Sequence, residues 1–363
     1  MDSNSRQIFE DELVMSKSIS RPSDLVFDAV HQPTTINGQT AYEREETLVY
    51  NQKPLVNFSN TGLMGGFQTI FNTYSCGVTK EQKEFESVVC DFLQVPEILV
   101  FPSYEAICAD FAANLLNDTD TIIYDEYCNP SLMRGIRLSA AEKLRFGHND
   151  MAKLEDKLKL SQMRRIRLIV TDGIFCDSGQ CANLNAIKQL AEKYNALVVV
   201  DDSFGFLACG KNGRGSDEHC GIRGFADLKI VNLQSTLKAS VGAFVCGDST
   251  LIELLRRRSV SLRYSVSVQR GTLATAAFDL QTFIDYSDDE RDALCENVLR
   301  LYDTLREMGF TPERPCSNIV SFTTETSADR LREMFLQRGW LCEFYKRGSK
   351  TTAVFRVTSE TKF

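Results

Sequence analysis

The feature that most constrains this chain is a regular alternation of amphipathic helices and short apolar strands. Residues 80–93 place Phe85, Val89 and Phe92 on one stripe at helical spacing, and the apolar run 98–101 follows directly. Further helices are expected at 105–116, 130–140, 151–160 and 184–194, and further strands at 121–124, 144–146, 167–171 and 196–200. Short strands separated by helices predict a mostly parallel sheet covered on both faces, and therefore an α/β fold.

Two regions flank this alternation. Residues 1–45 are polar and show little periodicity, so we expect an N-terminal arm that is partly disordered or folds against a partner. Beyond residue 260 the sequence predicts one long helix over 268–308, broken near Ser287. The smaller elements expected after it are a helix at 328–337 and strands at 318–322, 340–345 and 352–357. The predicted organisation is an arm at 1–45, a large α/β domain at 46–260, and a smaller α+β C-terminal domain at 261–363 that includes the long connecting helix.

The composition argues against several classes of partner. A formal net charge of −8 disfavours nucleic acid and anionic lipid, because both bind basic surfaces. The chain starts without an apolar stretch flanked by basic residues and contains no run of about 18 apolar residues, so neither a signal peptide nor a membrane span is expected. Without a secretory signal, the 12 cysteines are expected to be reduced thiols, and their spacing predicts no metal site.

Polar residues at the ends of three predicted strands mark a candidate binding site, since ligands of parallel α/β sheets bind at the carboxyl ends of strands. Asp172 and Asp201 each follow such a strand. The run DLKIVNLQSTLKASVGAFVCG at 227–247 reads as two strands joined by a polar turn that holds Thr236 and Lys238. A carboxylate and a lysine placed this way suit pyridoxal phosphate, whose ring nitrogen pairs with an acid and whose aldehyde binds an amine. The alternative is a helix cap at Asp201 and a solvated Lys238.

Two other motifs favour structural interpretations. The glycine-rich run GKNGRG at 210–215 lacks the GK[ST] element of a phosphate-binding loop and is interpreted as a tight loop. The run FGHND at 146–150 is typical of a helix start with Asn149 or Asp150 as its cap, which is favoured over a catalytic role for His148. No G-x-S-x-G sequence indicates serine-hydrolase chemistry.

Five segments in one order along the chain carry a family resemblance. They are FGHND (146–150), TDGIFCDSG (171–179), LAEKYNALVVVDDSFGFLACGKNGRGSDEHCGI (190–222), SVGAFVCG (240–247) and RYSVSV (263–268). These segments resemble the successive motifs of the α-oxoamine synthases, which are fold-type I pyridoxal phosphate enzymes. The resemblance extends over about residues 50–360. It implies the fold-type I transferase fold and pyridoxal 5'-phosphate as the cofactor.

Matched to the family motifs, the chain keeps one cofactor-binding residue and lacks others. The acid that pairs with the pyridine nitrogen matches Asp201, which would be vestigial here. The histidine that stacks on the cofactor ring matches Asn129, and the histidine of the family's Asp-Glu-x-His motif matches Phe204. The small glycine beside the phosphate matches Tyr104, whose side chain would intrude on the cofactor.

The position of the cofactor-binding lysine is the most informative departure. In active members this lysine lies six residues before the first glycine of a Gly-Gly pair. That glycine matches Gly242, so the resemblance puts Thr236 at the lysine position. Lys238 lies two residues later, a displacement of about 6.5 Å along an extended chain, which is comparable to the reach of a lysine side chain.

This combination of losses resembles one group within the family, the non-catalytic first (long-chain base) subunits of serine palmitoyltransferases. The resemblance implies that the isolated chain is inactive and forms a heterodimer with a catalytic second subunit whose lysine holds the cofactor. The complex would condense L-serine with palmitoyl-CoA to 3-ketosphinganine, the first step of sphingolipid synthesis. The group's N-terminal membrane helix is not found here, and its Gly-Pro-Arg-Gly-Phe-Tyr loop is reduced to TYSCGVTKEQ (73–82). The implied location is the cytosolic face of the endoplasmic reticulum, with attachment through a partner.

Two serines extend the resemblance to the partner's site. In homodimeric relatives, the hydroxyls of a Phe-Ser-x-Ser motif reach the cofactor phosphate of the other subunit, and these positions match Ser265 and Ser267. The alternative is that both are ordinary serines at a strand edge. For the whole chain, the competing hypothesis is an autonomous, homodimeric acyl-CoA:amino acid acyltransferase that uses Lys238. A third hypothesis is a fold-related protein of unrelated role.

Overall fold

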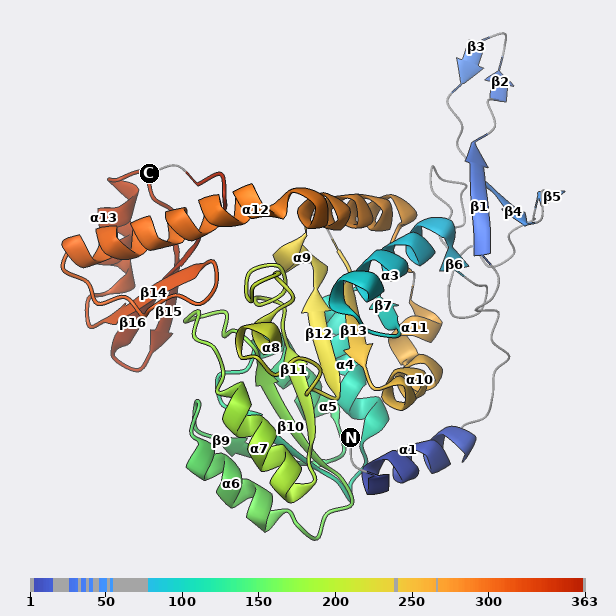
Figure 1. Cartoon of the computed structure of the whole chain (residues 1–363), viewed down its shortest axis with the longest axis horizontal. Helices are drawn as coiled ribbons and strands as arrows, with labels where there is room; N and C mark the ends of the chain where they lie inside the picture. The colour runs from blue at the N-terminus through green and yellow to red at the C-terminus, as the bar shows by residue number, and fades with distance from the viewer. Residues whose placement is uncertain are drawn as a thin grey trace. The chain divides into compact units, whose positions relative to one another are not determined.

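The computed structural model describes residues 3–15, 26–31, 34–36, 39–41, 46–50, 53–54, 78–237, 241–265 and 267–361 (Figure 1). The chain divides into two compact units. The first unit consists of residues 1–121, 131–143 and 227–281, and the second unit consists of residues 122–130, 144–226 and 282–363.

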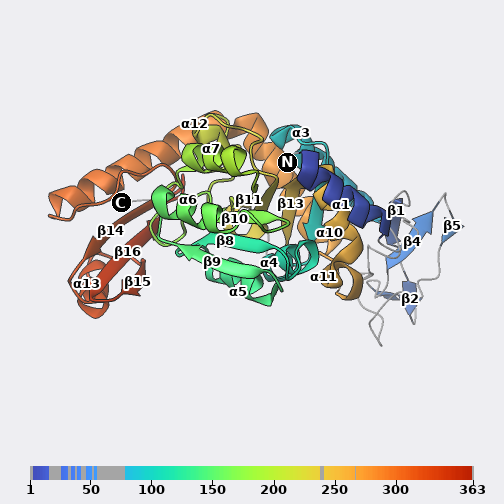
Figure 2. The ribbon, with the colours of Figure 1, turned by 90° about the horizontal axis from the view of Figure 1, so that it is seen from below.

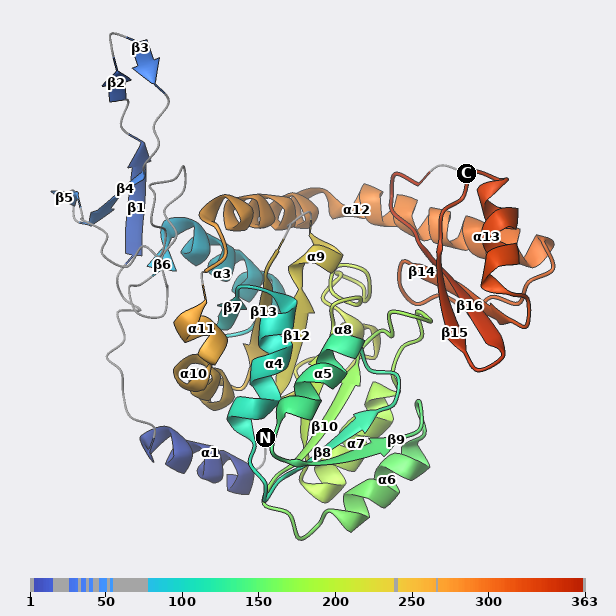
Figure 3. The same cartoon turned by 180° about the vertical axis from the view of Figure 1, so that it is seen from behind.

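Three buried strands form the sheet of the first unit. β7 (Ile98–Phe101), β13 (Ala243–Gly247) and β12 (Leu228–Asn232) lie side by side in this order, and β13 is antiparallel to both neighbours. The two predicted strands of the 227–247 stretch are thereby confirmed as an antiparallel pair. Helix α4 (Tyr104–Leu115) crosses the face of these strands, and α10 (Ser249–Arg258) packs beside it (Figure 3).

Side-chain caps explain where the helices of this unit begin. Thr79 accepts a hydrogen bond from the N–H of Gln82 and starts α3 (Lys80–Leu93). Asp248 accepts the N–H groups of Thr250 and Leu251 at the start of α10. Such caps satisfy N–H groups that have no partner within the helix, so each cap residue fixes the first turn.

The N-terminal residues include a helix that periodicity did not predict. Helix α1 (Ser3–Met15) packs on α10, where Arg258 Nη1 lies 2.8 Å from Glu12 Oε2 and Arg257 Nη1 donates to the carbonyl of Leu13 at 3.4 Å. Among residues 3–13 only Ser5 and Phe9 are buried. The contact between α1 and α10 includes an ion pair and a hydrogen bond, so few apolar residues of α1 are buried. A helix with so narrow a buried stripe shows too weak an apolar periodicity to be predicted.

Short strands follow α1 in the first unit. β1 pairs antiparallel with β4 and parallel with β6, β4 pairs with β5, and β2 pairs with β3. Their bounds are β1 (Val26–His31), β2 (Thr34–Ile36), β3 (Gln39–Ala41), β4 (Glu46–Tyr50), β5 (Lys53–Pro54) and β6 (Val78–Thr79).

The second unit contains the strands and helices of the predicted alternation. β11, β10, β8 and β9 are adjacent in this order, and β10 runs parallel to β11. Helices α6 and α7 lie side by side against these strands (Figure 2). The bounds are β8 (Thr121–Asp125), β9 (Glu142–Phe146), α6 (Met151–Leu160), β10 (Arg167–Asp172), α7 (Leu184–Tyr194) and β11 (Leu197–Asp201). Helix α5 (Pro130–Leu138), which lies between β8 and β9 in the chain, belongs to the first unit except for Pro130.

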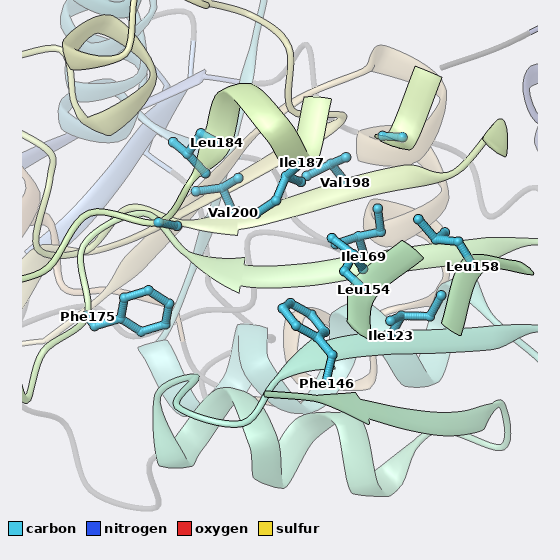
Figure 4. Packing of buried hydrophobic residues seen from close by; sticks show 12 residues of the cluster. Ile123, Phe146, Leu154, Leu158, Ile169, Phe175, Leu184, Ile187, Val198 and Val200 are labelled. Atoms are coloured by element: carbon cyan, nitrogen blue, oxygen red, sulfur yellow. The ribbon is translucent and has the colours of Figure 1, made fainter. Parts of the chain in front are cut away.

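The hydrophobic core of the second unit forms between these strands and helices. Phe146 of β9, Ile169 of β10 and Val198 of β11 meet Leu154 of α6 and Ile187 of α7, and all five side chains are buried (Figure 4). Every helix and strand predicted between residues 80 and 200 is present, with bounds that differ by two residues at most. The α/β prediction is therefore confirmed, and the mainly apolar strands β10 and β11 are covered by helices, as buried parallel strands require.

The C-terminal part of the second unit has its own small sheet. β14 (Ile319–Thr324) and β15 (Glu343–Arg347) both pair antiparallel with β16 (Lys350–Arg356), and α13 (Ala328–Leu336) packs on them. Aromatic rings fill the space between sheet and helix. They are Phe310, Phe322, Phe335, Trp340 and Phe355.

Helix α12 (Arg270–Glu307) precedes this sheet as one continuous helix (Figure 1). The predicted break near Ser287 is wrong. Residues 272–307 contain neither glycine nor proline, so nothing in the backbone forces an interruption, and a run of polar residues alone does not end a helix. Among the residues that the structure describes, no helix is both long and apolar enough to cross a membrane.

Candidate functional site

The ends of β10 and β11 place two carboxylates next to each other. Asp172 and Asp201 are in register on these parallel strands, and both side chains are buried. Ser203 donates its N–H to Asp201 Oδ1 at 3.1 Å, and its hydroxyl donates to the same oxygen. The N–H of Asn129 lies 3.1 Å from each carboxylate oxygen of Asp172. Burial, followed by the charge of Asp201, raises the pKa of Asp172 well above its usual range.

Two predicted site residues therefore lie together in the second unit. Asp201 is the register neighbour of Asp172, and Asn129 donates to Asp172. Asn129 directly precedes Pro130, the first residue of α5, where a proline costs no hydrogen bond. The alternative interpretation of Asp201 as a helix cap is wrong. Asp201 ends β11 and accepts hydrogen bonds from the turn that follows this strand. The sequence did not indicate the pairing with Asp172, although both aspartates end neighbouring predicted strands.

Asp202 holds the glycine-rich loop in place. Both of its carboxylate oxygens lie 3.1 Å from the N–H of Ser216, the first residue of α8 (Ser216–His219). A Cβ added at Gly173 or at Gly205 would lie 2.6 Å or 2.0 Å from Asp202 Oδ1. The close approach of Asp202 therefore leaves no room for a side chain at Gly173 or Gly205.

The GKNGRG loop is closed by an acidic side chain. Glu218 Oε2 accepts the N–H of Asn212 at 2.9 Å and the N–H of Arg214 at 3.1 Å. A phosphate-binding loop would present such N–H groups to its ligand, so the interpretation as a tight structural loop holds.

The FGHND segment is also structural. His148 Nδ1 lies 3.1 Å from Asp125 Oδ1, and His148 Nε2 lies 2.9 Å from Gln180 Oε1, so both ring nitrogens have partners. Asp150 accepts the N–H of Lys153 at 3.0 Å and caps α6, which confirms the predicted helix start.

Phe204, which the resemblance matches to a family histidine, packs against the C-terminal sheet. The guanidinium carbon of Arg356 lies 5.3 Å from the centroid of the Phe204 ring. Arg356 also donates to the carbonyl of Cys176 at 3.4 Å and pairs with Glu343. The aromatic ring therefore supports the contact between the strand end at Asp201 and β16.

In the first unit, Thr236 ends a single helical turn between β12 and β13. This turn is α9 (Leu233–Thr236), and Thr236 Oγ1 donates to the carbonyl of Asn232 at 3.2 Å. A threonine has no amine, so the position matched to the family lysine does not bind an aldehyde. Lys238 lies outside the described residues.

The segment that carries the two predicted serines lies against the same turn. Ser265 follows α11 (Val260–Tyr264), is exposed, and donates its N–H to the carbonyl of Ser261 at 3.1 Å. Val268 follows Ser267, and a Cβ added at Gly242 would lie 3.3 Å from Val268 Cγ2. The structure thus brings the serine segment beside the loop that begins with α9. Both serines lie between helices, so the alternative of strand-edge serines is wrong.

The start of α4 differs from a phosphate site. Ser103 Oγ accepts the N–H of Ala106 at 3.1 Å, so this helix end is already capped. Tyr104, the first helical residue, is 4% exposed. A buried phenol ring therefore occupies the position that the family motif gives to glycine.

Residues 70–353 match the family model described as aminotransferase class I and II, which is well over half of the chain. This chain belongs to that family. The aminotransferase-family chain is 32% identical over 264 residues to 2-amino-3-ketobutyrate coenzyme A ligase of Salmonella typhimurium, covering 72% of the chain and 66% of the relative. It is 29% identical over 302 residues to 8-amino-7-oxononanoate synthase of Thermosipho melanesiensis, covering 82% of the chain and 75% of the relative. The matched part therefore spans slightly less than two thirds of the ligase.

Solved structures agree on the fold. A serine palmitoyltransferase of Sphingomonas wittichii has a TM-score of 0.73 at 23% identity, covering 78% of this chain and 72% of the other. A lysine-to-alanine variant of a serine palmitoyltransferase from S. paucimobilis, with a bound pyridoxal phosphate–myriocin aldimine, has a TM-score of 0.76 at 21% identity, covering 100% of this chain and 95% of the other. The predicted resemblance to α-oxoamine synthases is confirmed, as is the fold-type I architecture with a mostly parallel central sheet and a smaller antiparallel C-terminal sheet.

Pyridoxal 5'-phosphate is the cofactor of this class, and the described residues fit it only in part. Asp201 offers a buried carboxylate of the kind that pairs with the ring nitrogen. Thr236 offers no amine, Asn129 offers no ring for stacking, and Tyr104 covers a helix start that is already capped. These residues do not fit a cofactor held covalently by this chain, so no catalytic step is assigned to them.

Proposed function

We propose that this chain is the lysine-less subunit of a pyridoxal phosphate-dependent acyltransferase of the serine palmitoyltransferase type. The observation that carries the proposal is that Thr236, the last residue of α9, occupies the position matched to the cofactor-binding lysine. The complex would condense L-serine with palmitoyl-CoA to 3-ketosphinganine, CO2 and CoA. Its catalytic second subunit would supply the lysine and hold the cofactor in a heterodimer.

The retained scaffold supports a role beside a partner's site. Asp201 and Asp172 keep a hydrogen-bonded, buried arrangement even though the lysine position has changed. The segment with Ser265 and Ser267 lies beside the loop that begins with α9, and Ser265 is exposed. Hydroxyl groups at such a place suit hydrogen bonds to a phosphate of the neighbouring subunit. The proposed location is the cytosolic face of the endoplasmic reticulum, with attachment through the partner.

The absorbance of the purified chain tests this proposal directly. A lysine-bound pyridoxal cofactor gives a visible band that borohydride abolishes by fixing the cofactor to the amine. We expect the chain alone, supplied with pyridoxal 5'-phosphate, to show no such band and no fixed cofactor by mass spectrometry. A catalytic relative with its lysine serves as the positive control.

A second candidate is an autonomous acyltransferase that uses Lys238. The observation in its favour is that two relatives, at 32% and 29% identity, are named as a coenzyme A ligase and an oxononanoate synthase. Borohydride fixation of the cofactor on Lys238, lost in Lys238→Ala, would support this second function and overturn the first.

A further inference from the structure

Four cysteines from distant parts of the sequence gather in the second unit. Cys181 Sγ lies 3.7 Å from Cys220 Sγ. Cys209 Sγ donates to the carbonyl of Cys316 at 3.0 Å, and Cys316 Sγ donates to the carbonyl of Gly179 at 3.3 Å. The thiols thus form a connected group around the turn that precedes Cys181.

The backbone on both sides of the closest pair is held in place. The turn before Cys181 is closed by a hydrogen bond of 2.9 Å from the N–H of Phe175 to the carbonyl of Gln180. Cys220 directly follows α8 as its C-cap, and the carbonyl of Cys220 accepts a hydrogen bond from Asn185 Nδ2 at 3.3 Å. The hydrogen-bonded backbone on both sides therefore places the two sulfur atoms near each other. A disulfide requires about 2.05 Å between sulfurs, so side-chain rotation must supply roughly 1.7 Å.

The thiols differ in solvent exposure and in pKa. Cys181 and Cys220 are partly exposed, whereas Cys209 is buried. A hydrogen bond from Cys181 lowers the pKa of the Cys220 thiol, and hydrogen bonds to Cys220 and Cys316 raise the pKa of Cys181. Hydrogen bonds with Cys181 and Cys209 also lower the pKa of Cys316, to about 3. Within the close Cys181–Cys220 pair, Cys220 is the thiol that supplies the attacking thiolate, because the thiolate is the nucleophile.

We propose that Cys181 and Cys220 form a reversible disulfide when the protein meets a small-molecule disulfide such as oxidised glutathione. The Cys220 thiolate attacks one sulfur of the oxidant, forms a mixed disulfide, and releases one glutathione thiolate. Cys181 then gives up its proton and attacks Cys220 Sγ, which forms the protein disulfide and releases the second glutathione. Two protein thiols are oxidised and one glutathione disulfide is reduced to two glutathione molecules, so electrons and protons balance.

The bond would join two segments that surround Asp202. Cys181 pairs with Ile174 in an isolated β-bridge next to Gly173, and Cys220 follows the helix whose start Asp202 caps. Cys316 remains as a neighbouring thiol that can reopen the bond by exchange. This site does not depend on the proposed function, because it needs neither cofactor nor partner subunit.

Peptide mapping of the oxidised full-length chain tests the proposal. The protein is incubated with oxidised glutathione, free thiols are blocked with iodoacetamide, and trypsin digestion follows without reduction. Tryptic peptide 168–188 carries Cys176 and Cys181, and peptide 215–223 carries Cys220 alone. We expect these two peptides to be linked in the natural chain and in Cys176→Ser, and to be unlinked in Cys181→Ser.

A second measurement follows the mixed disulfide with glutathione on Cys220 instead of the linked peptides. In Cys181→Ser the resolving thiol is lost, so we expect glutathione to accumulate on Cys220 at least tenfold over the natural chain. Absence of the linked peptide from the natural chain, or its persistence in Cys181→Ser, would overturn the proposal. So would equal glutathione occupancy of Cys220 in both proteins.

Discussion

At the scale of single residues, Asp201, which the resemblance matches to the family's ring-nitrogen acid, lies beside a second buried aspartate, Asp172. Ser203 and Asn129 supply hydrogen bonds to Asp201 and Asp172 from the backbone of the same unit. Asp172 remains costly to ionise, because burial and the neighbouring charge both oppose its negative form. Because its pKa is raised, Asp172 should affect how the stability of the folded chain depends on pH.

Asp172→Asn should change how stability depends on pH. The folded chain holds the Asp172 proton more tightly than the unfolded chain, whose carboxyl has a pKa near 3.8. The free energy of unfolding contributed by Asp172 is therefore fully present below that value and is lost as pH rises through the raised folded pKa. Asparagine does not titrate, so we expect the variant to gain stability relative to the natural chain as pH rises from about 5 to about 8.

Urea denaturation at several pH values measures this effect. Asp156→Asn, which changes an exposed carboxylate with 57% of its side chain accessible, is the matched control and should leave the pH dependence unchanged. Identical pH slopes for Asp172→Asn and the natural chain would contradict the assignment of the buried proton.

Ser265 and Ser267 give a second prediction at this scale. If both hydroxyls donate to the phosphate of the partner's cofactor, the double change to alanine should weaken cofactor binding by the complex about tenfold or more, since hydrogen bonds to charged groups contribute about 1.5–3 kcal/mol each. Equilibrium dialysis of the reconstituted heterodimer measures the affinity. Ser261→Ala, in the preceding helix α11, is the control, and unchanged affinity in the double variant would exclude the role.

At the scale of helices and strands, the packing of α5 on α4 requires a glycine that the hydrophobic pattern of the sequence does not indicate. Within the first unit, α5 approaches α4 so closely that a Cβ at Gly135 would lie 1.6 Å from the carbonyl oxygen of Cys108. The two helices lie next to each other in Figure 3. Because the obstacle is backbone, it does not move aside as a flexible side chain would.

Gly135→Ala should therefore destabilise the first unit. Overpacking of this kind costs typically about 1–3 kcal/mol, and a backbone obstacle places the change at the upper end. Leu138→Ala on the same helix removes a side chain that is 60% exposed and should change stability by less than about 0.5 kcal/mol. Thermal or urea unfolding compares the two variants, and equal stability of Gly135→Ala and Leu138→Ala would refute the close contact.

The limits of sequence-based prediction also appear at this scale. The strands β7, β8, β10 and β11 were predictable because each contains a short apolar run between helices with clear stripes. The start of α6 was predictable from Asp150, whose side chain caps it. Helix α1 was not predictable, because a narrow buried stripe and ion pairs to α10 stabilise it. The continuity of α12 through Ser287 was missed, because polar residues resemble a loop in sequence.

The site was only partly predictable for a related reason. Motif spacing located Asp201 and Thr236 at strand and turn ends where the structure has them. Contacts between residues far apart in the chain carry no local pattern. The hydrogen bonds of Asn129 to Asp172 and the thiol pair of Cys181 and Cys220 are of this kind.

At the scale of the whole molecule, the chain combines a retained family fold with an altered cofactor-binding position. The family model covers residues 70–353, and the α/β core is intact in both units. Asp172 and Asp201 remain buried and hydrogen-bonded within this fold. This arrangement is consistent with our proposal that another subunit performs the chemistry.

The most direct test of this account is an assay of serine-dependent CoA release from palmitoyl-CoA. This chain and a lysine-bearing family member from the same cell are purified separately and after co-expression. We expect activity only from the co-expressed pair, with this chain alone at background. Activity from this chain alone would contradict the account, and so would full activity of the second protein without it.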